Sequence, residues 1–522
     1  MKKILIKLKQ KPDWIILALL SVVSGFVFFY RLGLLPLIQW DEAVYASWSR
    51  DISINSNWFM INPFWPFDKP PLYIWLTTLL FKFFGISEFT ARFWSAFSGV
   101  LAVLATYFLG KKFFGRVTGF LAALFLLSIP QFIHSGRLGM MDVFLSFWIL
   151  LILYFFWKGL KKPKTFLLMG LALAGAILTK QVISLILPLG IIGLWALFTK
   201  EFKFLREKYF WAGLGLSFLL TVPWYIVMFM LYKREFLEYH FLYHVFKRGI
   251  EAIEGHTGDR FFYLASLNQG MGAWKFFVPA GILYFFLKFS LKDFSLLKKE
   301  LFLLFWILVI FIVGTAVKTK MTTYILPIYP AFAITVANFL VESFKREKIA
   351  LLLFFLFSVI FLFYQDLPIN RFIIFSIILV SFLGAIYNNF LKQVLKPVVL
   401  MALTLGLFLV NFNLVWNTTV NWPGIPIDSI SAEAGQFIAK QNPPPPVYVS
   451  GNVSNIVIYF YSGKKVELGP LKEVVSKFSP ETMGVTSKEE FLNTPPSLKE
   501  RLSILRELSN REGHTIMVYK LK

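Results

Sequence analysis

Apolar runs long enough to cross a bilayer recur along most of this chain, and they leave few folds open to it. A transmembrane helix needs about 20 predominantly apolar residues, and each of these runs has roughly 17–22. Because lipid offers the main chain no hydrogen-bond partners, the runs are predicted to be helices rather than open strands. About thirteen spans are expected, near residues 14–35, 90–110, 116–133, 141–157, 165–180, 182–199, 209–231, 270–287, 300–317, 323–342, 349–364, 371–387 and 396–416.

Basic residues account for the net charge of +24, and their positions along the chain indicate how it is oriented in the membrane. With the N-terminus inside, the inner loops of this threading begin near Gly110, Lys158, Lys200, Lys288 and Phe344, and every one is basic. Cytoplasmic loops of membrane proteins carry such an excess of Lys and Arg. The pattern predicts a multi-pass protein of the cytoplasmic (inner) membrane with a cytoplasmic N-terminus, and it argues against a nucleic-acid partner.

The outer side then holds two long loops, 36–89 and 232–269, and the tail 417–522. In the first loop, "DEAVYASWSRDI" and "PPLYIWLTTLLFKFFG" are typical of helices that lie flat in the membrane interface. The tail alternates strand-like and helical segments after a Pro-rich linker, which predicts a small extracytoplasmic α/β domain. Residues 1–416 are expected to form the membrane domain. The chain has no phosphate-binding loop of the type that holds nucleotides, so no nucleotide cofactor is expected.

Acidic residues gather at the outer ends of these predicted spans. Asp41 and Glu42 follow the first span, and Asp142 stands at the outer end of another. Two acids that converge from different spans can supply a general base and an electrostatic partner. The alternatives are that Asp41 is a helix N-cap and that Asp142 forms an ion pair with Arg137.

Cations stand beside the acids on this side. Lys69 in "FDKPP" is a candidate phosphate contact, because two prolines fix the backbone that carries it. The alternative is a local salt bridge with Asp68. Arg248 and Lys320 lie near other outer span ends, and phosphate recognition favours several such donors.

Two histidines and an arginine in the second loop follow helical spacing. His240, His244 and Arg248 are separated by four residues each, which places them on one helical face. Two such histidines and an acid such as Asp68 can hold a divalent metal. The same spacing also occurs on ordinary solvated helix faces.

Five motifs in order carry a resemblance to a known family. "WDEAVYASWSRDI", "FDKPPLYIWL", "RLGMMDVFLSFWILL", "YHVFKRGIEAIEGHTGDRFFYL" and "KTKMTTYILPIYPAFAI" together resemble multi-spanning glycosyltransferases that use polyprenyl-phosphate sugars. The similarity is to lipid A aminoarabinose transferases and protein O-mannosyltransferases, both of the GT-C architecture. It covers the membrane domain to about Pro330 and the remainder only in layout.

The resemblance implies roles for individual residues. Asp41 corresponds to the catalytic aspartate of the family, with Glu42 beside it, and Asp142 to the second acidic position. Lys69 and Arg248 correspond to residues that meet the lipid phosphate.

Further correspondences concern the substrate and a metal. Phosphate or sugar contacts are implied for Lys320 and Tyr324 of the "K…Y-x-L-P" motif, and Arg137 is grouped with them. In some members an acid and a histidine at the positions of Asp68 and His244 bind a divalent metal (Zn, Mg or Mn). His240 competes with His244 for that place.

The function implied is transfer of a monosaccharide from a polyprenyl phosphate to a lipid, glycan or protein acceptor at the outer membrane face, with inversion. The alternative is a transporter or flippase of lipid-linked sugars. A transporter predicts charged residues at the bilayer midplane and inverted repeats, whereas the ionisable residues of this chain gather at the outer rim.

Overall fold

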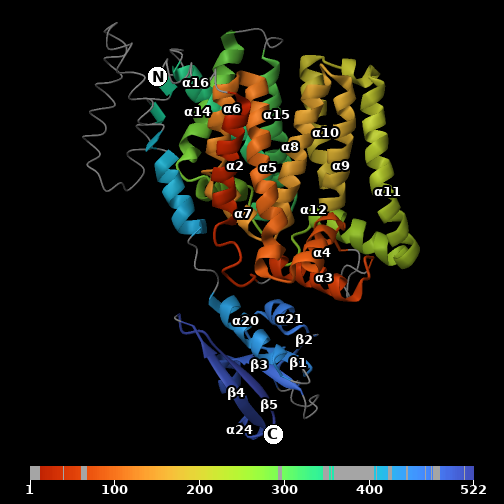
Figure 1. Cartoon of the computed structure of the whole chain (residues 1–522), viewed down its shortest axis with the longest axis vertical. Helices are drawn as coiled ribbons and strands as arrows, with labels where there is room; N and C mark the ends of the chain where they lie inside the picture. Colours follow the sequence, from red (N-terminus) through yellow and green to blue (C-terminus); the bar gives the residue numbers. More distant parts are fainter. Residues whose placement is uncertain are drawn as a thin grey trace, which may run out of the picture.

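Long helices stand side by side in a bundle, and shorter helices close one end of it (Figure 1). The computed structural model describes residues 12–38, 40–59, 68–291, 297–344, 352–353, 356–357, 405–406, 408–420, 426–441, 445–464, 466–471, 473, 482–510 and 512–522. The helices of the bundle are α2 (Asp13–Phe29), α5 (Glu88–Phe114), α6 (Arg116–Leu126), α7 (Pro130–Arg137), α8 (Met141–Gly159), α9 (Phe166–Lys180), α10 (Ile183–Thr199), α11 (Lys208–Phe236), α13 (Phe262–Gly270), α14 (Trp274–Leu291), α15 (Lys298–Ala316) and α16 (Tyr329–Phe344). The shorter helical segments are α3 (Asp41–Asn55), α4 (Leu72–Phe84), η1 (Pro163–Thr165), η2 (Lys203–Arg206), η3 (Leu237–Lys247), α12 (Arg248–Ile250), η5 (Thr322–Ile328) and η6 (Trp416–Val420).

Six helices of the described residues are long and apolar enough to cross a membrane, or eight if each of two bent pairs is one span. The apolar helices α2 and α10 have 17 residues each. The protein is therefore a multi-pass helical membrane protein, as its apolar runs predict. The count of thirteen stays a prediction, because the expected span 371–387 lies wholly outside the described residues and the expected spans 349–364 and 396–416 are described only in part.

One expected span, 116–133, is bent, and a second bend lies at the start of the expected span 270–287. The segment 116–133 divides into α6 and α7, which meet at 64°. Pro130 opens α7, and its missing N–H and fixed φ suit a helix start but not a helix interior. The α13 and α14 pair is bent by 116°.

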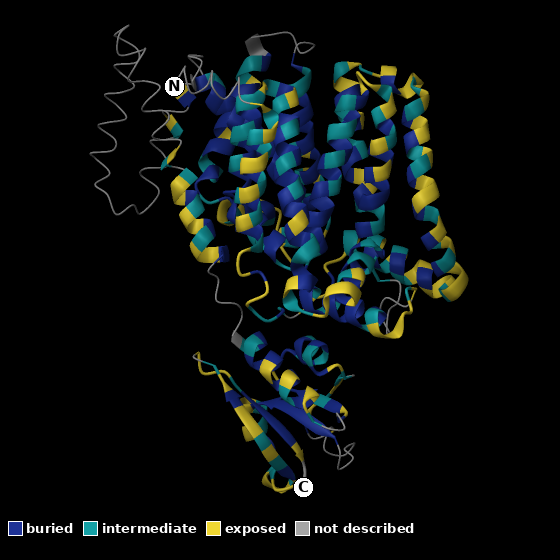
Figure 2. Ribbon diagram, viewed as in Figure 1, coloured by how far each residue is buried: buried dark blue, intermediate teal, exposed yellow. Residues whose placement is uncertain are grey.

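The burial pattern fits a membrane environment. Figure 2 shows buried residues between the helices and exposed ones along α11 at the edge of the bundle. Exposed side chains on α11 are apolar, with Phe218 and Leu219 both 69% exposed and Met230 70% exposed. A large exposed apolar surface of this kind marks a contact with lipid or with another protein.

The basic loops share one end of the bundle. Lys112, near the end of α5, lies within electrostatic reach of Lys158, Lys161 and Lys162 at and after the end of α8, and of Lys299 at the start of α15. The helices α3 and α4 lie at the opposite end (Figure 1). The structure therefore separates the basic loops from the acidic motifs, which is the separation that the positive-inside rule requires.

The C-terminal segment contains a five-stranded mixed sheet of order β2-β1-β3-β5-β4. β1 pairs in parallel with β2 and β3, whereas β5 pairs antiparallel with β3 and β4. The elements are α20 (Pro426–Ala439), β1 (Val447–Ser450), α21 (Asn455–Ser462), β2 (Val466–Leu468), β3 (Met483–Ser487), α23 (Lys488–Leu492), α24 (Pro496–Lys499), β4 (Leu502–Ser509) and β5 (Thr515–Leu521).

This segment contacts the bundle through α21, which packs on α3 (Figure 1). The buried Arg50 of α3 donates to the main-chain oxygens of Tyr459 and Phe460, both at 2.6 Å. Those oxygens belong to the last turn of α21, where helix carbonyls lack internal partners and favour a cation. Arg50 therefore joins the C-terminal segment to the helix that begins with Asp41.

Candidate active site

Asp41 is the first residue of α3, and its surroundings are strongly charged. Trp40 precedes it with a φ of 71°, a left-handed conformation that is rare for a bulky residue. The helix start has no side-chain cap hydrogen bond, so the alternative that Asp41 is an N-cap is wrong. Its charge instead benefits from the N-terminal end of the helix.

Burial raises the pKa of the Asp41 carboxyl, because the charged form loses hydration. The positive charge of Lys69 opposes this shift, and the negative charge of Asp142 adds to it. These three residues come from separate segments, so the fold places them within electrostatic reach of each other. A carboxyl with a raised pKa is better matched to proton transfer near neutral pH than an ordinary surface aspartate.

Asp142 forms an ion pair with a residue that the sequence motifs do not include. It lies in the first turn of α8, and its Oδ1 is 2.6 Å from Nζ of Lys180, the last residue of α9. The expected alternative, an ion pair with Arg137, is therefore wrong. Lys180 also lies over the ring of Tyr324, 5.0 Å from the centroid. Lys180, at the C-terminal end of the apolar helix α9, thus brings a positive charge to the acidic cluster.

Arg137 has a structural role at the end of α2. Its guanidinium donates to the main-chain oxygens of Val27 and Phe28 at 2.8 and 3.1 Å, and to that of Tyr30 at 2.8 Å. These oxygens are the unsatisfied acceptors at a helix C-terminus. The grouping of Arg137 with the residues that contact the sugar or the donor phosphate is not supported, because its hydrogen bonds hold it against the end of α2.

Asp68 is the centre of a compact hydrogen-bonded group. Its Oδ1 is 3.1 Å from Nζ of Lys69 and 2.6 Å from Nε2 of His244. Burial alone would raise the pKa of Asp68, but Lys69 and His244 outweigh burial and lower it below the usual value. Gln181 donates from Nε2 to the Asp68 main-chain oxygen at 3.1 Å. The local Asp68–Lys69 salt bridge is therefore present, and it holds the lysine beside the acidic cluster.

Arg248 and Tyr324 complete the positive side of the site. Arg248 donates to the Tyr324 hydroxyl at 3.0 Å and pairs with Glu254 at 2.6 Å. Because Tyr324 also lies under Lys180, one aromatic ring connects the arginine of the second loop with the Asp142–Lys180 pair.

Glu42 lies beside Asp41 in sequence but faces a different environment. Both of its oxygens accept from Arg92, at 2.8 and 2.9 Å. Main-chain N–H groups of Gly139 and Ile38 donate to the same carboxylate at 2.6 and 2.8 Å. Burial would raise the pKa of Glu42, but Arg92 and these donors lower it. With its acceptor sites filled, Glu42 anchors the start of α3, and its expected catalytic role stays a prediction.

Lys320 is also committed to a local contact. Its Nζ donates to the oxygens of Gly314 and Thr315 at 3.1 and 2.6 Å, at the end of α15. It also lies 5.5 Å from the ring centroid of Tyr263. The expectation that Lys320 contacts a phosphate is not supported, since its ammonium caps a helix.

The residues proposed as metal ligands separate into two places. His244 meets Asp68, whereas His240 is fully buried among aromatic rings, with Phe236 at 4.9 Å and Trp224 at 5.6 Å between centroids. Nδ1 of His240 is 3.3 Å from Gln181.

Within the described part of the chain, no three His, Cys, Asp or Glu side chains are grouped closely enough to hold a metal ion. Zinc sites in proteins use three or four protein ligands, and the Asp68 oxygen near His244 also accepts from Lys69. Among the residues that the structure describes, Asp68 and His244 alone do not complete a metal site, and the expected divalent metal stays a prediction.

Lys180 and Gln181 are the functional residues that sequence reasoning missed. A lysine within the apolar run "GAILTKQVIS" is costly in a membrane unless it has a partner, and that cost is itself a signal of function. Gln181 has a φ of 53°, a strained conformation at the sharp turn between α9 and α10. This turn directs both side chains toward the site.

The arrangement combines a partly buried carboxylate with several fixed cations. Such a site can accept a proton from a nucleophile at the carboxylate and stabilise negative charge on a nearby phosphate. Its ionisable members are Asp41, Asp142, Asp68, Lys69, Lys180, His244 and Arg248.

Comparisons with known proteins agree with this description. The family model for dolichyl-phosphate-mannose-protein mannosyltransferase matches residues 68–227. An uncharacterized protein of Aquifex aeolicus is 32% identical over 346 residues, which is 64% of this chain and 66% of that protein. The undecaprenyl phosphate-alpha-4-amino-4-deoxy-L-arabinose arabinosyl transferase of Erwinia tasmaniensis is 27% identical over 331 residues, 61% of this chain and 58% of the relative. The chain thus spans less than two thirds of the length of either relative.

A solved structure has a similar fold over nearly its whole length. ArnT from Cupriavidus metallidurans, bound to undecaprenyl phosphate, superposes with a TM-score of 0.72. The two sequences are 20% identical, and the match covers 97% of this chain and 98% of that one. At this identity the likeness concerns the fold, and it covers both the helical bundle and the C-terminal segment.

Proposed function

We propose that this chain, which belongs to the GT-C membrane glycosyltransferases related to lipid A aminoarabinose transferases and protein O-mannosyltransferases, transfers a monosaccharide from a polyprenyl-phosphate donor. The acceptor is a lipid, a glycan or a protein at the outer face of the cytoplasmic membrane. The observation that carries the proposal is the Asp41 carboxylate within reach of Lys69 and Lys180 at one end of an apolar bundle.

The cations of the site suit the phosphate of the donor. Lys69 and Arg248 have side chains that are 15% and 16% exposed, so each is shielded from bulk water but still accessible. Charges in such a place act through a lower effective dielectric than in water, which strengthens their attraction to phosphate. The polyprenyl chain would lie along the apolar surface of the bundle.

The proposed reaction is a single displacement. The acceptor oxygen attacks the anomeric carbon, the bond from that carbon to the phosphate oxygen breaks, and the acceptor proton passes to Asp41. The bond electrons leave with the polyprenyl phosphate, whose added charge Lys69 and Arg248 stabilise. One displacement inverts the anomeric centre, which the stereochemistry of the product tests.

Asp142 and Lys180 have supporting roles in this scheme. The 2.6 Å ion pair between Asp142 and Lys180 holds Lys180 near Asp41. It also balances the charge of Lys180, which would otherwise be buried without a partner at the end of α9. The field of Asp142 raises the proton affinity of Asp41, which a general base requires.

Replacement of Asp41 tests the function. In proteoliposomes with a radiolabelled polyprenyl-phosphate sugar and an alcohol acceptor, Asp41→Asn should reduce turnover by about 10²–10⁴-fold, the usual contribution of general-base catalysis. Asp259→Asn removes the same charge from an exposed loop residue and should leave turnover unchanged. Near-normal turnover by Asp41→Asn would end the assignment of Asp41 as the base.

The pH dependence provides a second test. Asp41 accepts a proton only when ionised, so activity should rise with pH through its pKa. Because burial raises that pKa, the rise should lie above the ordinary aspartate value of 3.8. An activity that is flat from pH 4 to 8, or that falls, would contradict the role of Asp41.

Transport of lipid-linked sugars is the other candidate from the sequence, and nothing in the comparisons favours it. The relative from Erwinia tasmaniensis is an arabinosyl transferase. The described charged residues of the site also lie at one end of the bundle, where α3 and α4 cap it (Figure 1), rather than at mid-depth where transporters bind substrates.

A further inference from the structure

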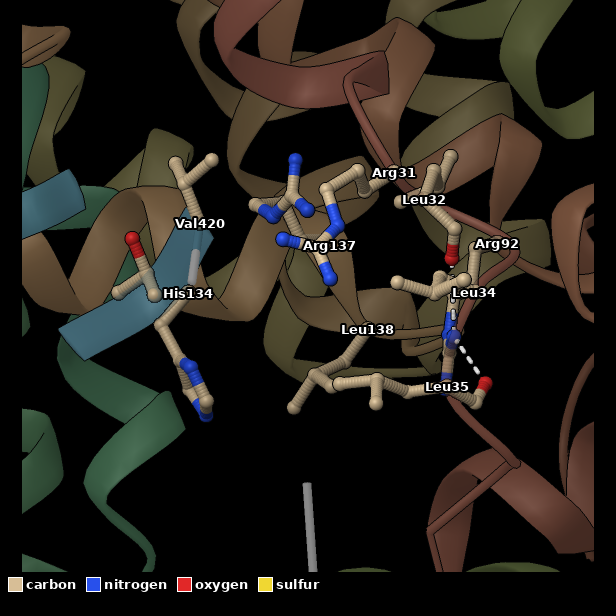
Figure 3. Close-up of a pocket in the computed structure, with 10 residues that line it drawn as sticks. Arg31, Leu32, Leu34, Leu35, Arg92, His134, Arg137, Leu138 and Val420 are labelled. Atoms are coloured by element: carbon tan, nitrogen blue, oxygen red, sulfur yellow. Dashed lines mark hydrogen bonds between the residues drawn. The ribbon is translucent and has the colours of Figure 1, made fainter. Parts of the chain in front are cut away.

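The segment that leads into Asp41 is held in place by side chains from distant parts of the chain. The guanidinium of Arg92, on α5, donates to the main-chain oxygens of Leu32 and Leu35 at 2.9 and 2.8 Å (Figure 3). The start of α3 has no side-chain cap hydrogen bond of its own. The direction of the Asp41 side chain therefore depends on how the preceding segment is fixed from outside.

One of the side chains that fix this segment belongs to the C-terminal part of the chain. The hydroxyl of Tyr461, in the last turn of α21, accepts a hydrogen bond from the Leu37 main-chain N–H at 3.2 Å. It donates to Oε1 of Glu88, the first residue of α5, at 2.7 Å. Burial and the charge of Glu88 raise the pKa of the Tyr461 hydroxyl, so it remains a donor at neutral pH. One hydroxyl thus joins the main chain just before Asp41 to the start of α5.

The side chain of Leu37 adds an apolar contact at the same place. Leu37 is fully buried, in a cluster that includes Ala43 of α3 and Phe460 of α21. A main-chain N–H that loses its partner in such surroundings is costly. Loss of the Tyr461 hydroxyl would therefore favour a shift of the main chain at Leu37.

The same turn of α21 contacts α3 at a second place, away from Asp41. The hydroxyl of Tyr459 donates to Oδ2 of Asp51 at 2.5 Å. Asp51 lies about 15 Å further along the axis of α3 than Asp41, at the usual rise of about 1.5 Å per residue. The two tyrosines therefore offer matched perturbations of one helical turn, and of the two hydroxyls it is that of Tyr461 that contacts the segment before Asp41.

We propose that Tyr461 is a positioning residue for the transfer reaction: its hydroxyl fixes the main chain at Leu37 and thereby the approach of the Asp41 carboxylate to the acceptor. The inference rests on the proposed function, since it takes Asp41 as the base. It gives the C-terminal segment a part in catalysis through the main chain that carries the base. A misplacement of about 1 Å can reduce the rate of an enzyme by about 10²-fold, so a small shift at Leu37 is sufficient to affect turnover.

The substitution Tyr461→Phe removes the hydroxyl and keeps the ring, and Tyr459→Phe is the matched control. Full-length protein in proteoliposomes is assayed with a radiolabelled polyprenyl-phosphate sugar and an alcohol acceptor, and kcat and the KM for the donor are measured. Turnover is divided by the number of sites that bind a sugar-free polyprenyl phosphate, measured by calorimetry. A loss of folded protein then does not count as a loss of rate.

Tyr461→Phe should lower kcat per donor-binding site by about 10–100-fold and leave the KM for the donor within about twofold of wild type, because Lys69 and Arg248 come from other segments. Tyr459→Phe should keep kcat within about twofold of wild type. Hydrogen exchange of the amides in residues 37–44 should become about tenfold faster in Tyr461→Phe and stay unchanged in Tyr459→Phe. A fall in kcat smaller than about tenfold in Tyr461→Phe, a change in KM alone, or an equal loss in Tyr459→Phe would overturn the proposal.

The wild type separates this inference from the proposed function. If the wild type transfers no sugar, the proposed function fails and the positioning role falls with it. If the wild type transfers sugar and Tyr461→Phe does so at an undiminished rate, the positioning role alone is refuted.

Discussion

The substitution Glu42→Gln tests whether the carboxylate beside the proposed base is a structural anchor. Glu42 is 2% exposed and accepts four hydrogen bonds from Arg92, Gly139 and Ile38. Glutamine keeps the size but replaces one oxygen with an amide NH₂. Each carboxylate oxygen faces two N–H donors, so either orientation of the amide sets an NH₂ group against two donors and leaves the Arg92 charge unpaired.

The expected cost follows from burial of the pair. Removal of one partner of a buried ion pair costs about 3–5 kcal/mol, because the remaining charge stays buried. The individual hydrogen bonds are not added to this figure, since they belong to one coupled network. Glu88→Gln is the matched control: Glu88 accepts a hydrogen bond from the Tyr461 hydroxyl at 2.7 Å, and its replacement should cost only about 0.5–1.5 kcal/mol.

The assay is equilibrium unfolding of the purified protein in mixed micelles, in which sodium dodecyl sulfate is titrated and tryptophan fluorescence is recorded. Activity of the folded variant gives a second measurement. Because the Glu42 carboxylate is bound to Arg92, Gly139 and Ile38, Glu42→Gln should lower turnover through displacement of Asp41 while the pH at which activity rises stays unchanged. A loss of stability no greater than that of Glu88→Gln would refute the anchoring role.

Three further substitutions or treatments test the remaining parts of the site. Lys180→Gln removes the partner of Asp142 and should reduce turnover by about 10²–10³-fold, as loss of one electrostatic stabiliser does in other enzymes. Lys180→Arg keeps the charge and should recover part of the activity. Turnover of Lys180→Gln within twofold of wild type would contradict the role of Lys180. Asp68 and His244 are only two metal ligands among the described residues, so protein without bound polyprenyl-phosphate sugar, after dialysis against a chelator, should contain well under one equivalent of metal by mass spectrometry. One equivalent of zinc in the wild type that is lost in Asp68→Asn would instead show a complete metal site. Arg50→Ala deletes the contact to the last turn of α21 and should speed hydrogen exchange of the amides in α21 about tenfold or more, since hydrogen bonds to a charged group are worth about 1.5–3 kcal/mol. Unchanged exchange would show that other contacts hold α21 against α3.

Some residues of the site are visible in the sequence because their chemistry is unusual for their position. Asp41, Asp68 and Asp142 are acids near apolar runs, and charge there is costly unless a site compensates it. Lys69 is fixed by the prolines that follow it. Local chemistry of this kind can be read without knowledge of what the residue meets.

The partners of these residues could not be predicted in the same way. Arg137 stands closer to Asp142 in sequence than Lys180 does, and it lies on the same expected outer side, yet it turns toward the carbonyls of α2. Glu42 follows Asp41 directly in the sequence, but its side chain leaves the helix in a different direction and binds Arg92. A difference of one position along a helix changes direction by about 100°, so neighbours in sequence acquire different roles.

The apolar periodicity and the placement of basic loops by themselves determined the helical membrane class, and the five motifs indicated the family. These properties depend on the free energy of transfer of side chains between water and lipid, and each segment contributes to it independently of the others. Tertiary structure alone decided which cation meets which acid, because those contacts depend on how helices far apart in the chain pack and turn. The pairing of Asp142 with Lys180 and the contact of Tyr461 with Leu37 are both consequences of that packing.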